Sequence, residues 1–221
     1  MKREELKNKK YLLFDLDGTL TDSQEGILRC FRHAFETLGI EVPDEGRMKS
    51  FLGPPLSASF RSVIGEDEVK VAEAVRIYRE RYSTIGLFEN RPYDGTDILL
   101  RKLRDSGYTL AVATSKPEVF SRRILDRFGL SEYFEVITGC GLDGTLDTKA
   151  EVIEETLRRL GAADKAECIM IGDRKQDILG AHEAGLECIG VYWGFAEDGE
   201  LEASGADAIA NTAEELKEMF I

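Results

Sequence analysis

The sequence predicts an α/β fold: a Rossmann-like parallel sheet flanked by helices, with an inserted all-helical cap domain. Two observations predict the sheet. Short apolar segments alternate with helical patterns along most of the 221 residues. These apolar segments are continuous, as in strands that helices cover on both faces. A third observation predicts the insertion, because residues 22–90 contain no segment with a convincing strand pattern.

Six apolar segments carry the strand pattern, and helical segments separate them. The predicted strands are residues 11–16, 109–114, 134–138, 168–171, 188–192 and the weaker 207–210. The predicted helices are residues 95–105, 117–128, 148–160, 176–184 and 213–220. Glycine follows three of these helices, at positions 129, 161 and 185, where a left-handed residue commonly ends a helix.

The insertion is predicted to contain several helices. Asp22 and Glu25 have capping-box spacing and predict a helix that ends at Gly39. Three of the chain's five prolines divide the remainder into short helices and one long helix near residues 66–86. We therefore expect an α/β core of residues 1–21 and 91–221 and a helical cap of residues 22–90.

Composition excludes several classes of protein. The net charge of −13 disfavours nucleic acid and anionic lipid as partners. The absence of a long apolar run predicts no membrane span, and the polar segment 1–10 does not have the pattern of a signal peptide. Two histidines and four cysteines without a C-x-x-C pair argue against zinc ribbons and redox motifs. A cytoplasmic protein with reduced thiols is expected, and its oligomeric state, monomer or dimer, stays open.

The strongest chemical feature is the sequence Asp-Leu-Asp-Gly-Thr-Leu at residues 15–20. Asp15 and Asp17 follow the first predicted strand and enter a glycine-containing turn. At the carboxyl end of a strand in an open α/β sheet, such side chains face the crevice where ligands bind. Two like charges this close need a cation or a bound proton, so the pair suggests a divalent metal site.

Further polar residues follow other predicted strands. Thr114 and Ser115 end the second strand and precede a helix opened by proline, which predicts a phosphate cradle. Lys149 begins another helix and would supply a positive charge to the same anion. Asp173 would provide an oxygen ligand for a hard cation, and Asp177 lies one helical turn further on.

Together these residues resemble the haloacid dehalogenase superfamily of phosphatases, in the subgroup that includes phosphoglycolate phosphatases. The segment 15–20 resembles the first family motif, Thr114 the second and Lys149 the third, while the segment 172–177 resembles the fourth. The insertion resembles that subgroup's cap domain in position and size. The resemblance covers the whole chain.

The resemblance implies a Mg²⁺-dependent phosphatase. Asp15 would attack phosphorus and form an aspartyl-phosphate, which requires no activating base at pH 7. Asp17 would protonate the leaving oxygen and then deprotonate the hydrolytic water. Mg²⁺ would lie between the Asp15 carboxylate, the Asp17 backbone carbonyl and Asp173. Asp177 would act outside the metal's direct ligands.

The substrate implied is a small phosphorylated metabolite. Thr114, the Ser115 amide and Lys149 would hold its phosphoryl oxygens. The cap would set specificity through residues 51–55 and through nearby cations that suit a second anionic group; these are Arg47, Lys49 and Arg61. Trp193 and Phe195, beyond the fifth strand, are interpreted as packing residues.

Several alternatives remain open. Ala150 follows Lys149 where phosphoglycolate phosphatases commonly have proline, and a Lys-Pro pair occurs instead at residues 116–117, where it would shape the cradle or meet the cap. A nucleoside monophosphate 5'-nucleotidase and a sugar phosphomutase would use the same nucleophile. A non-enzymatic phospho-receiver shares an acid cluster but lacks the turn at residues 15–20.

Two further motifs are not assigned a catalytic role, and the second of them is interpreted as a loop. The glycines at 139, 141 and 144 have the spacing of a dinucleotide fingerprint but follow the third strand instead of the first, so an oxidoreductase is not expected. Residues 142–146 repeat the sequence Leu-Asp-Gly-Thr-Leu, but Gly141 stands where the nucleophile would be.

Overall fold

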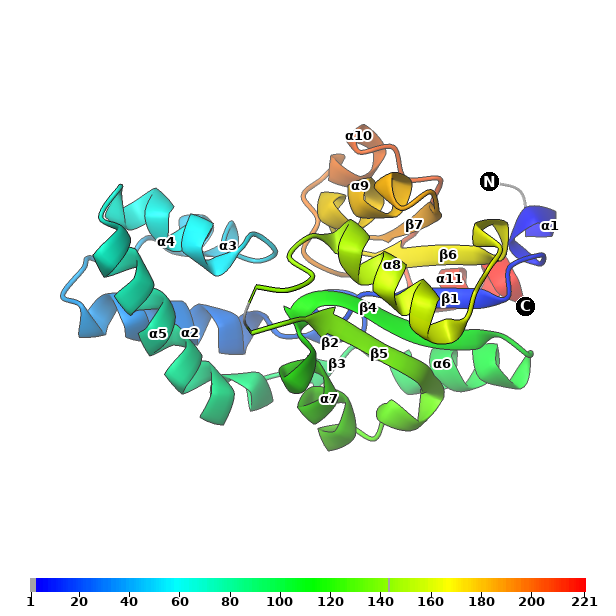
Figure 1. The fold of residues 1–221 in the computed structure, drawn as a ribbon, viewed down its shortest axis with the longest axis horizontal. Coiled ribbons are helices and arrows are strands. Elements are labelled where there is room, and N and C mark those ends of the chain that lie inside the picture. Colours follow the sequence, from blue (N-terminus) through cyan, green and yellow to red (C-terminus); the bar gives the residue numbers. More distant parts are fainter. Residues whose placement is uncertain (1–2, 143) are drawn as a thin grey trace. The chain divides into compact units, whose positions relative to one another are not determined.

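The computed structural model describes residues 3–142 and 144–221 and divides into two compact units (Figure 1). One unit comprises Met1–Thr21 and Pro92–Ile221, and the other comprises Asp22–Arg91. Where the chain passes from one to the other, β2 (Thr21–Asp22) pairs with β3 (Arg91–Pro92).

The first unit contains a six-stranded parallel sheet in the order β5-β4-β1-β6-β7-β8, which confirms the predicted α/β fold. Its strands are β1 (Tyr11–Phe14), β4 (Thr109–Pro117), β5 (Phe134–Cys140), β6 (Cys168–Gly172), β7 (Glu187–Val191) and β8 (Ala208–Ala210). The chain proceeds from β1 to β4 in one direction and from β6 to β7 in the other. The strand order therefore reverses between β1 and β6, which is where an open α/β sheet forms its ligand crevice.

Helices cover both faces of this sheet. On one face α8 (Lys149–Leu160) and α9 (Lys175–Glu183) pack against each other and against β4 and β6 (Figure 1). The other helices are α1 (Arg3–Leu6), α6 (Thr96–Asp105), α7 (Glu118–Arg127), α10 (Glu200–Ala203) and α11 (Ala213–Phe220). The 3₁₀ turns are η2 (Ser131–Tyr133) and η3 (Lys165–Glu167).

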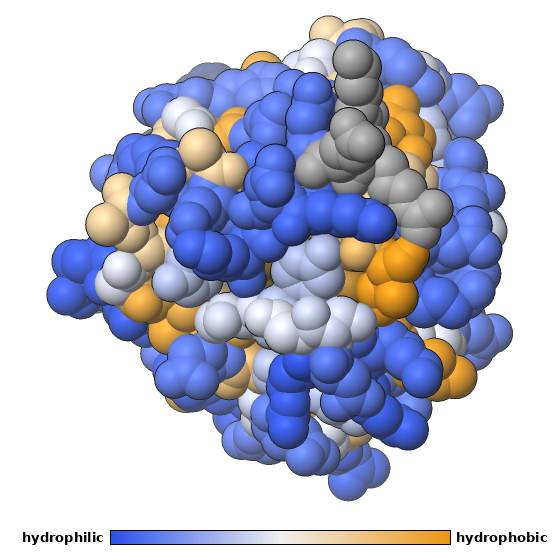
Figure 2. Space-filling model, turned by 90° about the vertical axis from the view of Figure 1, so that its right-hand side faces the viewer, coloured by the Kyte–Doolittle hydropathy of each residue, from blue (hydrophilic) through white to orange (hydrophobic). Residues whose placement is uncertain are grey.

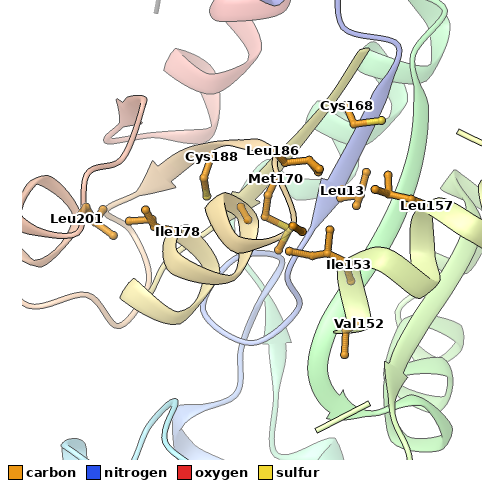
Figure 3. Packing of buried hydrophobic residues seen from close by; sticks show 14 residues of the cluster. Leu13, Val152, Ile153, Leu157, Cys168, Met170, Ile178, Leu186, Cys188 and Leu201 are labelled. Atoms are coloured by element: carbon orange, nitrogen blue, oxygen red, sulfur yellow. The ribbon is translucent and has the colours of Figure 1, made fainter. Parts of the chain in front are cut away.

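Burial on both faces explains the continuous apolar strands. Leu13 belongs to the cluster beneath α8 and α9 together with Met170, Ile153 and Ile178 (Figure 3). Its neighbour Phe14, which points to the opposite face, is also fully buried. Successive side chains of a strand alternate between faces, so both sets are apolar only when both faces are covered.

The second unit is entirely helical apart from its ends in β2 and β3. It contains α2 (Gln24–Thr37), α3 (Glu45–Lys49), α4 (Leu56–Ile64), α5 (Glu68–Thr84) and η1 (Gly86–Phe88). An aromatic cluster forms its core, with the Phe31 ring centroid 4.8 Å from Phe60 and 5.0 Å from both Phe51 and Tyr78. Such contacts give a small unit a large share of its apolar burial.

Some details of this unit differ from the sequence-based expectations. The capping box at Asp22 is not formed, because α2 begins after Ser23 and the Asp22 carboxylate lies 3.0 Å from Arg91. Phe51, the first residue of the segment expected to set specificity, is only 4% exposed and packs within the aromatic cluster. The role of residues 51–55 in substrate selection stays a prediction.

The three cap cations that were expected to select an anionic substrate have partners within the unit. Arg61 forms two hydrogen bonds of 2.8 Å to Glu68, Lys49 lies 3.5 Å from Glu45, and Arg47 donates to the carbonyl oxygen of Ser62. Their role in substrate selection stays a prediction.

The face drawn in Figure 2 is largely hydrophilic, and the hydrophobic residues on it are scattered. Within residues 3–142 and 144–221, no helix combines the length and the hydropathy needed to cross a membrane. The four cysteines are free thiols in this structure, and three of them are buried.

Candidate active site

The proposed nucleophile lies beside the point where the strand order reverses. Asp15 follows β1 directly, and its backbone amide donates to the Ile171 carbonyl oxygen of β6 at 2.9 Å. On the other side of β1, Phe14 is paired with Val112 of β4, so Asp15 lies near the level of Thr114. Asp15 is 7% exposed, which makes it an enclosed carboxylate at the carboxyl edge of the sheet.

Lys149 connects three elements at this edge. It is the first residue of α8, whose start is fixed by a capping box between Thr148 and Glu151. Its Nζ lies 2.7 Å from Asp15 Oδ1, 2.6 Å from Asp177 Oδ1 and 3.2 Å from the Ala113 carbonyl oxygen.

The charge of Lys149 is held by its two carboxylate partners. Burial alone would lower the pKa of Lys149, but Asp15 and Asp177 outweigh burial and raise this pKa above the ordinary lysine value. The ammonium group is therefore positively charged at neutral pH.

Asp173 is the most enclosed carboxylate of the site, with no exposed surface. Its Oδ1 accepts from the Thr19 hydroxyl at 3.2 Å, and its Oδ2 accepts from the Phe195 amide at 2.7 Å. Burial raises the pKa of Asp173 well above its ordinary value, and the charges of Asp177 and Asp15 raise it further. A nearby cation would relieve this cost.

The three buried carboxylates fit a hard divalent cation such as Mg²⁺. Oxygen atoms of Asp15, Asp173 and Asp177 all lie within 4.8 Å of one another, and oxygen donors are those that Mg²⁺ prefers. Both oxygens of Asp177 already have partners, because Oδ1 binds Lys149 and Oδ2 accepts from the Arg174 amide at 3.0 Å. Asp15 and Asp173 are therefore the better candidates for direct ligands, and the Asp17 carbonyl stays a predicted third.

Two glycines make room for Asp173. A Cβ added at Gly18 would lie 2.1 Å from Asp173 Oδ2, and Gly18 also has a φ of +86°. A Cβ at Gly194 would lie 2.2 Å from the Gly18 carbonyl oxygen and 2.5 Å from Asp173 Cβ. Neither position accepts a side chain without displacing the turn or the carboxylate.

Asp17 has a partner that the sequence analysis did not identify. Its Oδ2 lies 2.6 Å from Nζ of Lys116, and its Oδ1 is buried without a hydrogen-bond partner among the described residues. In the sequence, the Lys-Pro pair at residues 116–117 was the only feature that pointed to a role for Lys116. Its contact with the first motif could not be deduced, because the two segments are distant in sequence.

Thr114 and Ser115 end the regular part of β4. Thr114 is buried, and its hydroxyl accepts from the Lys116 amide at 3.3 Å, whereas Ser115 is exposed. The helix expected after Pro117 is present as α7. The phosphate contacts of Thr114 and Ser115 stay predictions.

The segment after β7 supports the turn that carries Asp17 and contributes more than the packing role first assigned to it. The Trp193 indole Nε1 donates to the Thr19 carbonyl oxygen at 2.9 Å, while the Phe195 amide binds Asp173. Positions 193–195 thus hold both the nucleophile turn and the Asp173 carboxylate, which directly follows β6. In the sequence, the only signal for this role was a single tryptophan directly after the predicted strand 188–192.

Of the two overlapping motifs at residues 139–146, the glycine motif begins within β5. Gly139 lies where β5 passes the turn after β4, since a Cβ there would be 2.3 Å from the Lys116 carbonyl oxygen. Close backbone packing therefore accounts for this glycine. Asp143, in the repeated Leu-Asp-Gly-Thr-Leu sequence, lies outside the described residues.

Comparison with known proteins agrees with the motif resemblance. The family model for haloacid dehalogenase-like hydrolases matches residues 12–191. A 5'-nucleotidase of Pseudomonas aeruginosa is 49% identical over 192 residues, covering 87% of this chain and 86% of that protein. A phosphoglycolate phosphatase of Aquifex aeolicus is 29% identical over 188 residues, covering 85% and 87% respectively.

A solved structure extends the similarity to the fold. A predicted phosphatase from Clostridium acetobutylicum superposes with a TM-score of 0.89 at 44% identity, covering 95% of this chain and 97% of that one. A family match over most of the length, together with relatives that span nearly the whole chain, shows the family. The chain belongs to the haloacid dehalogenase-like hydrolases and is one of their phosphatases.

Proposed function

We propose that the enzyme hydrolyses a small phosphomonoester in a Mg²⁺-dependent reaction, through an aspartyl-phosphate on Asp15. One observation carries this proposal: Lys149 holds Asp15 at 2.7 Å, beside the fully buried carboxylate of Asp173. A charged nucleophile, a fixed cation and an oxygen-rich metal site are the components that phosphoryl transfer needs.

In the first step, an Asp15 carboxylate oxygen attacks phosphorus in line with the ester bond. The bond from phosphorus to the ester oxygen breaks, and its electron pair stays on the leaving oxygen. Asp17 gives a proton to that oxygen, so the products are an alcohol and the Asp15 aspartyl-phosphate.

In the second step, water attacks the phosphorus atom of the aspartyl-phosphate. Asp17 accepts a proton from the water, and the bond between phosphorus and the Asp15 oxygen breaks. Inorganic phosphate leaves, and both aspartates return to their starting protonation states. The reaction thus consumes one water and one ester.

Charge stabilisation comes from the residues around the phosphoryl group. Lys149, the Thr114 hydroxyl and the Ser115 amide bind its oxygens where negative charge spreads in the transition state. Asp15 and Asp173 would hold Mg²⁺, which supplies charge neutralisation and orients the phosphoryl oxygens when it is bound.

A nucleoside 5'-monophosphate is the second candidate substrate besides a phosphoglycolate-like ester. It is supported by the 49% identity to a 5'-nucleotidase, against 29% to a phosphoglycolate phosphatase. Selection between them is assigned to the helical cap, a prediction that the substrate panel tests.

The test is hydrolysis of an aryl phosphate with and without Mg²⁺, followed by a panel that includes phosphoglycolate and nucleoside monophosphates. We expect turnover that EDTA abolishes and Mg²⁺ restores, and a loss of at least about 10³-fold in Asp15→Asn. Asp198→Asn, an exposed control, should match the wild type. Wild-type turnover in Asp15→Asn would refute the nucleophile, and equal rates across the panel would refute selection by the cap.

A further inference from the structure

We propose that Lys116 is a positioning residue for Asp17: it binds one carboxylate oxygen and thereby presents the other to the ester oxygen of the substrate. The proposal rests on the proposed function, since it assigns a task within the same reaction. In this proposal the two lysines bind different aspartates: Lys149 binds the nucleophile Asp15, and Lys116 binds the proton donor Asp17.

Lys116 and Asp17 form an enclosed ion pair. Lys116 Nζ lies 2.6 Å from Asp17 Oδ2, and the Lys116 side chain is only 6% exposed. An enclosed ammonium group with a carboxylate at this distance is held in one orientation. The carboxylate plane of Asp17 is therefore fixed through one of its two oxygens.

The second observation concerns Oδ1, the other carboxylate oxygen of Asp17. Oδ1 is buried and has no hydrogen-bond partner within the part of the chain that the structure describes. A buried acceptor without a partner costs free energy, so such an atom at a functional site has a partner elsewhere in the cycle. The ester oxygen of the substrate, and later the attacking water, are the hydroxyl-type partners that the reaction brings.

The backbone fixes Lys116 independently of its side chain. The pairing of β4 with β5 shifts register between Thr114 and Pro117, which leaves residues 115 and 116 outside the regular ladder. The Lys116 amide donates to the Thr114 hydroxyl at 3.3 Å, and its carbonyl oxygen lies against Gly139. An irregularity of this kind redirects a side chain that a regular strand would send to a sheet face.

The proposal predicts a dependence on the leaving group. An alkoxide is a strong base and must receive a proton as the ester bond breaks, whereas 2,4-dinitrophenolate leaves without one. If Lys116 orients Asp17 for this proton transfer, its loss slows alkyl esters far more than dinitrophenyl esters. A residue that only stabilises the fold, or only attracts phosphate, slows both alike.

The experiment measures kcat/KM for an alkyl phosphate and for 2,4-dinitrophenyl phosphate in Lys116→Met, Lys116→Arg and Asp17→Asn. We expect Lys116→Met to lose about 10–100-fold more on the alkyl ester than on the dinitrophenyl ester, as Asp17→Asn does, because general acid catalysis contributes about 10²–10⁴-fold. Lys116→Arg should recover part of the alkyl activity. Lys102→Met, an exposed lysine of α6, is the matched control.

Equal losses on both esters would overturn the proposal. So would a raised KM with unchanged kcat, which would make Lys116 a substrate ligand. Failure of the proposed function gives a different result, since the wild type then hydrolyses neither ester, or Asp17→Asn shows no leaving-group dependence. Melting temperatures of Lys116→Met and Lys116→Arg identify any loss of folding, and Lys116→Arg provides the second test if Lys116→Met fails to fold.

Discussion

Asp173→Asn should stabilise the metal-free enzyme while weakening its metal binding. The substitution removes the charge of a fully buried carboxylate but conserves its shape. The amide can also keep both contacts, because its oxygen accepts from the Phe195 amide and its NH₂ donates to the Thr19 hydroxyl. The expected change is therefore electrostatic.

Its magnitude follows from the spacing of the acids. Oxygens of Asp15, Asp173 and Asp177 lie within 4.8 Å of one another, so each pair of ionised groups repels by about 3.5 kcal/mol at an effective dielectric constant of 20. Asp173 is repelled by Asp15 and by Asp177, and the positive charge of Lys149 offsets roughly one of these two repulsions. We expect a gain of about 2–4 kcal/mol, equivalent to about 4–16 °C in melting temperature for a protein of this size.

The sign of the pH dependence follows from the raised pKa of Asp173. Near pH 4 and below, the folded carboxyl is neutral, so the wild type and Asp173→Asn should differ little. As the pH rises above the ordinary aspartate value, the unfolded chain ionises first and the wild type loses stability. The advantage of the variant should therefore grow from pH 4 towards pH 8.

The assay is thermal unfolding in EDTA across this pH range, then with added Mg²⁺. Mg²⁺ should raise the melting temperature of the wild type and have a much smaller effect on Asp173→Asn. Trp193, the only tryptophan of the chain, binds the Thr19 carbonyl and provides a fluorescence signal for the same titration. A variant that melts at or below the wild-type temperature at pH 8 would refute the electrostatic reasoning, with Asp198→Asn as control.

Two further substitutions test the supporting structure. Gly194→Ala should lower the free energy of unfolding by about 1–3 kcal/mol and weaken Mg²⁺ binding, because its Cβ would lie 2.2 Å from the Gly18 carbonyl oxygen. Gly46→Ala, whose Cβ would lie 3.3 Å from a carboxylate oxygen of Asp44, should cost less and leave Mg²⁺ binding unchanged. Unchanged Mg²⁺ affinity in Gly194→Ala would contradict this reasoning. Arg81→Met should destabilise the helical unit by about 1–3 kcal/mol in urea at pH 7, because Arg81 binds Glu89 through two hydrogen bonds. The Arg81 hydrogen bonds lower the pKa of Glu89, so the difference in unfolding free energy between the wild type and Arg81→Met should shrink as the pH falls below about 4. A difference that does not change with pH would exclude the Arg81–Glu89 pair as the cause of the destabilisation.

Much of the fold and the site was predictable because both depend on local patterns. Apolar runs specify strands covered on both faces, and the carboxyl ends of neighbouring parallel strands meet at one edge. Asp15 after β1 and Asp173 after β6 lie close together because these two strands are neighbours in the sheet, an order that the sequence analysis did not predict. Lys149 joined them because a helix that returns across the sheet begins at the same edge.

The contacts that sequence reasoning missed join segments that no local pattern connects. The Lys116 side chain leaves β4 at an irregularity in its pairing, which a strand pattern does not reveal. Trp193 donates to Thr19 across 174 residues, through a loop whose course depends on tertiary packing. In the cap, the aromatic packing that buries Phe51 joins residues from several helices, so its neighbours could not be predicted from the segment 51–55 alone.

The charges of the site explain how an acidic protein binds a phosphate dianion. Four carboxylates, from Asp15, Asp17, Asp173 and Asp177, face the two lysines Lys116 and Lys149, which leaves a net charge of −2 when all are ionised. One divalent cation balances that excess, and a monovalent cation does not. A bound divalent cation would favour the ionised form of Asp173 and would remove the repulsion that the substrate otherwise meets. The chain's net charge of −13 would then place no barrier at the proposed phosphate site, because a cation bound there would set the local charge.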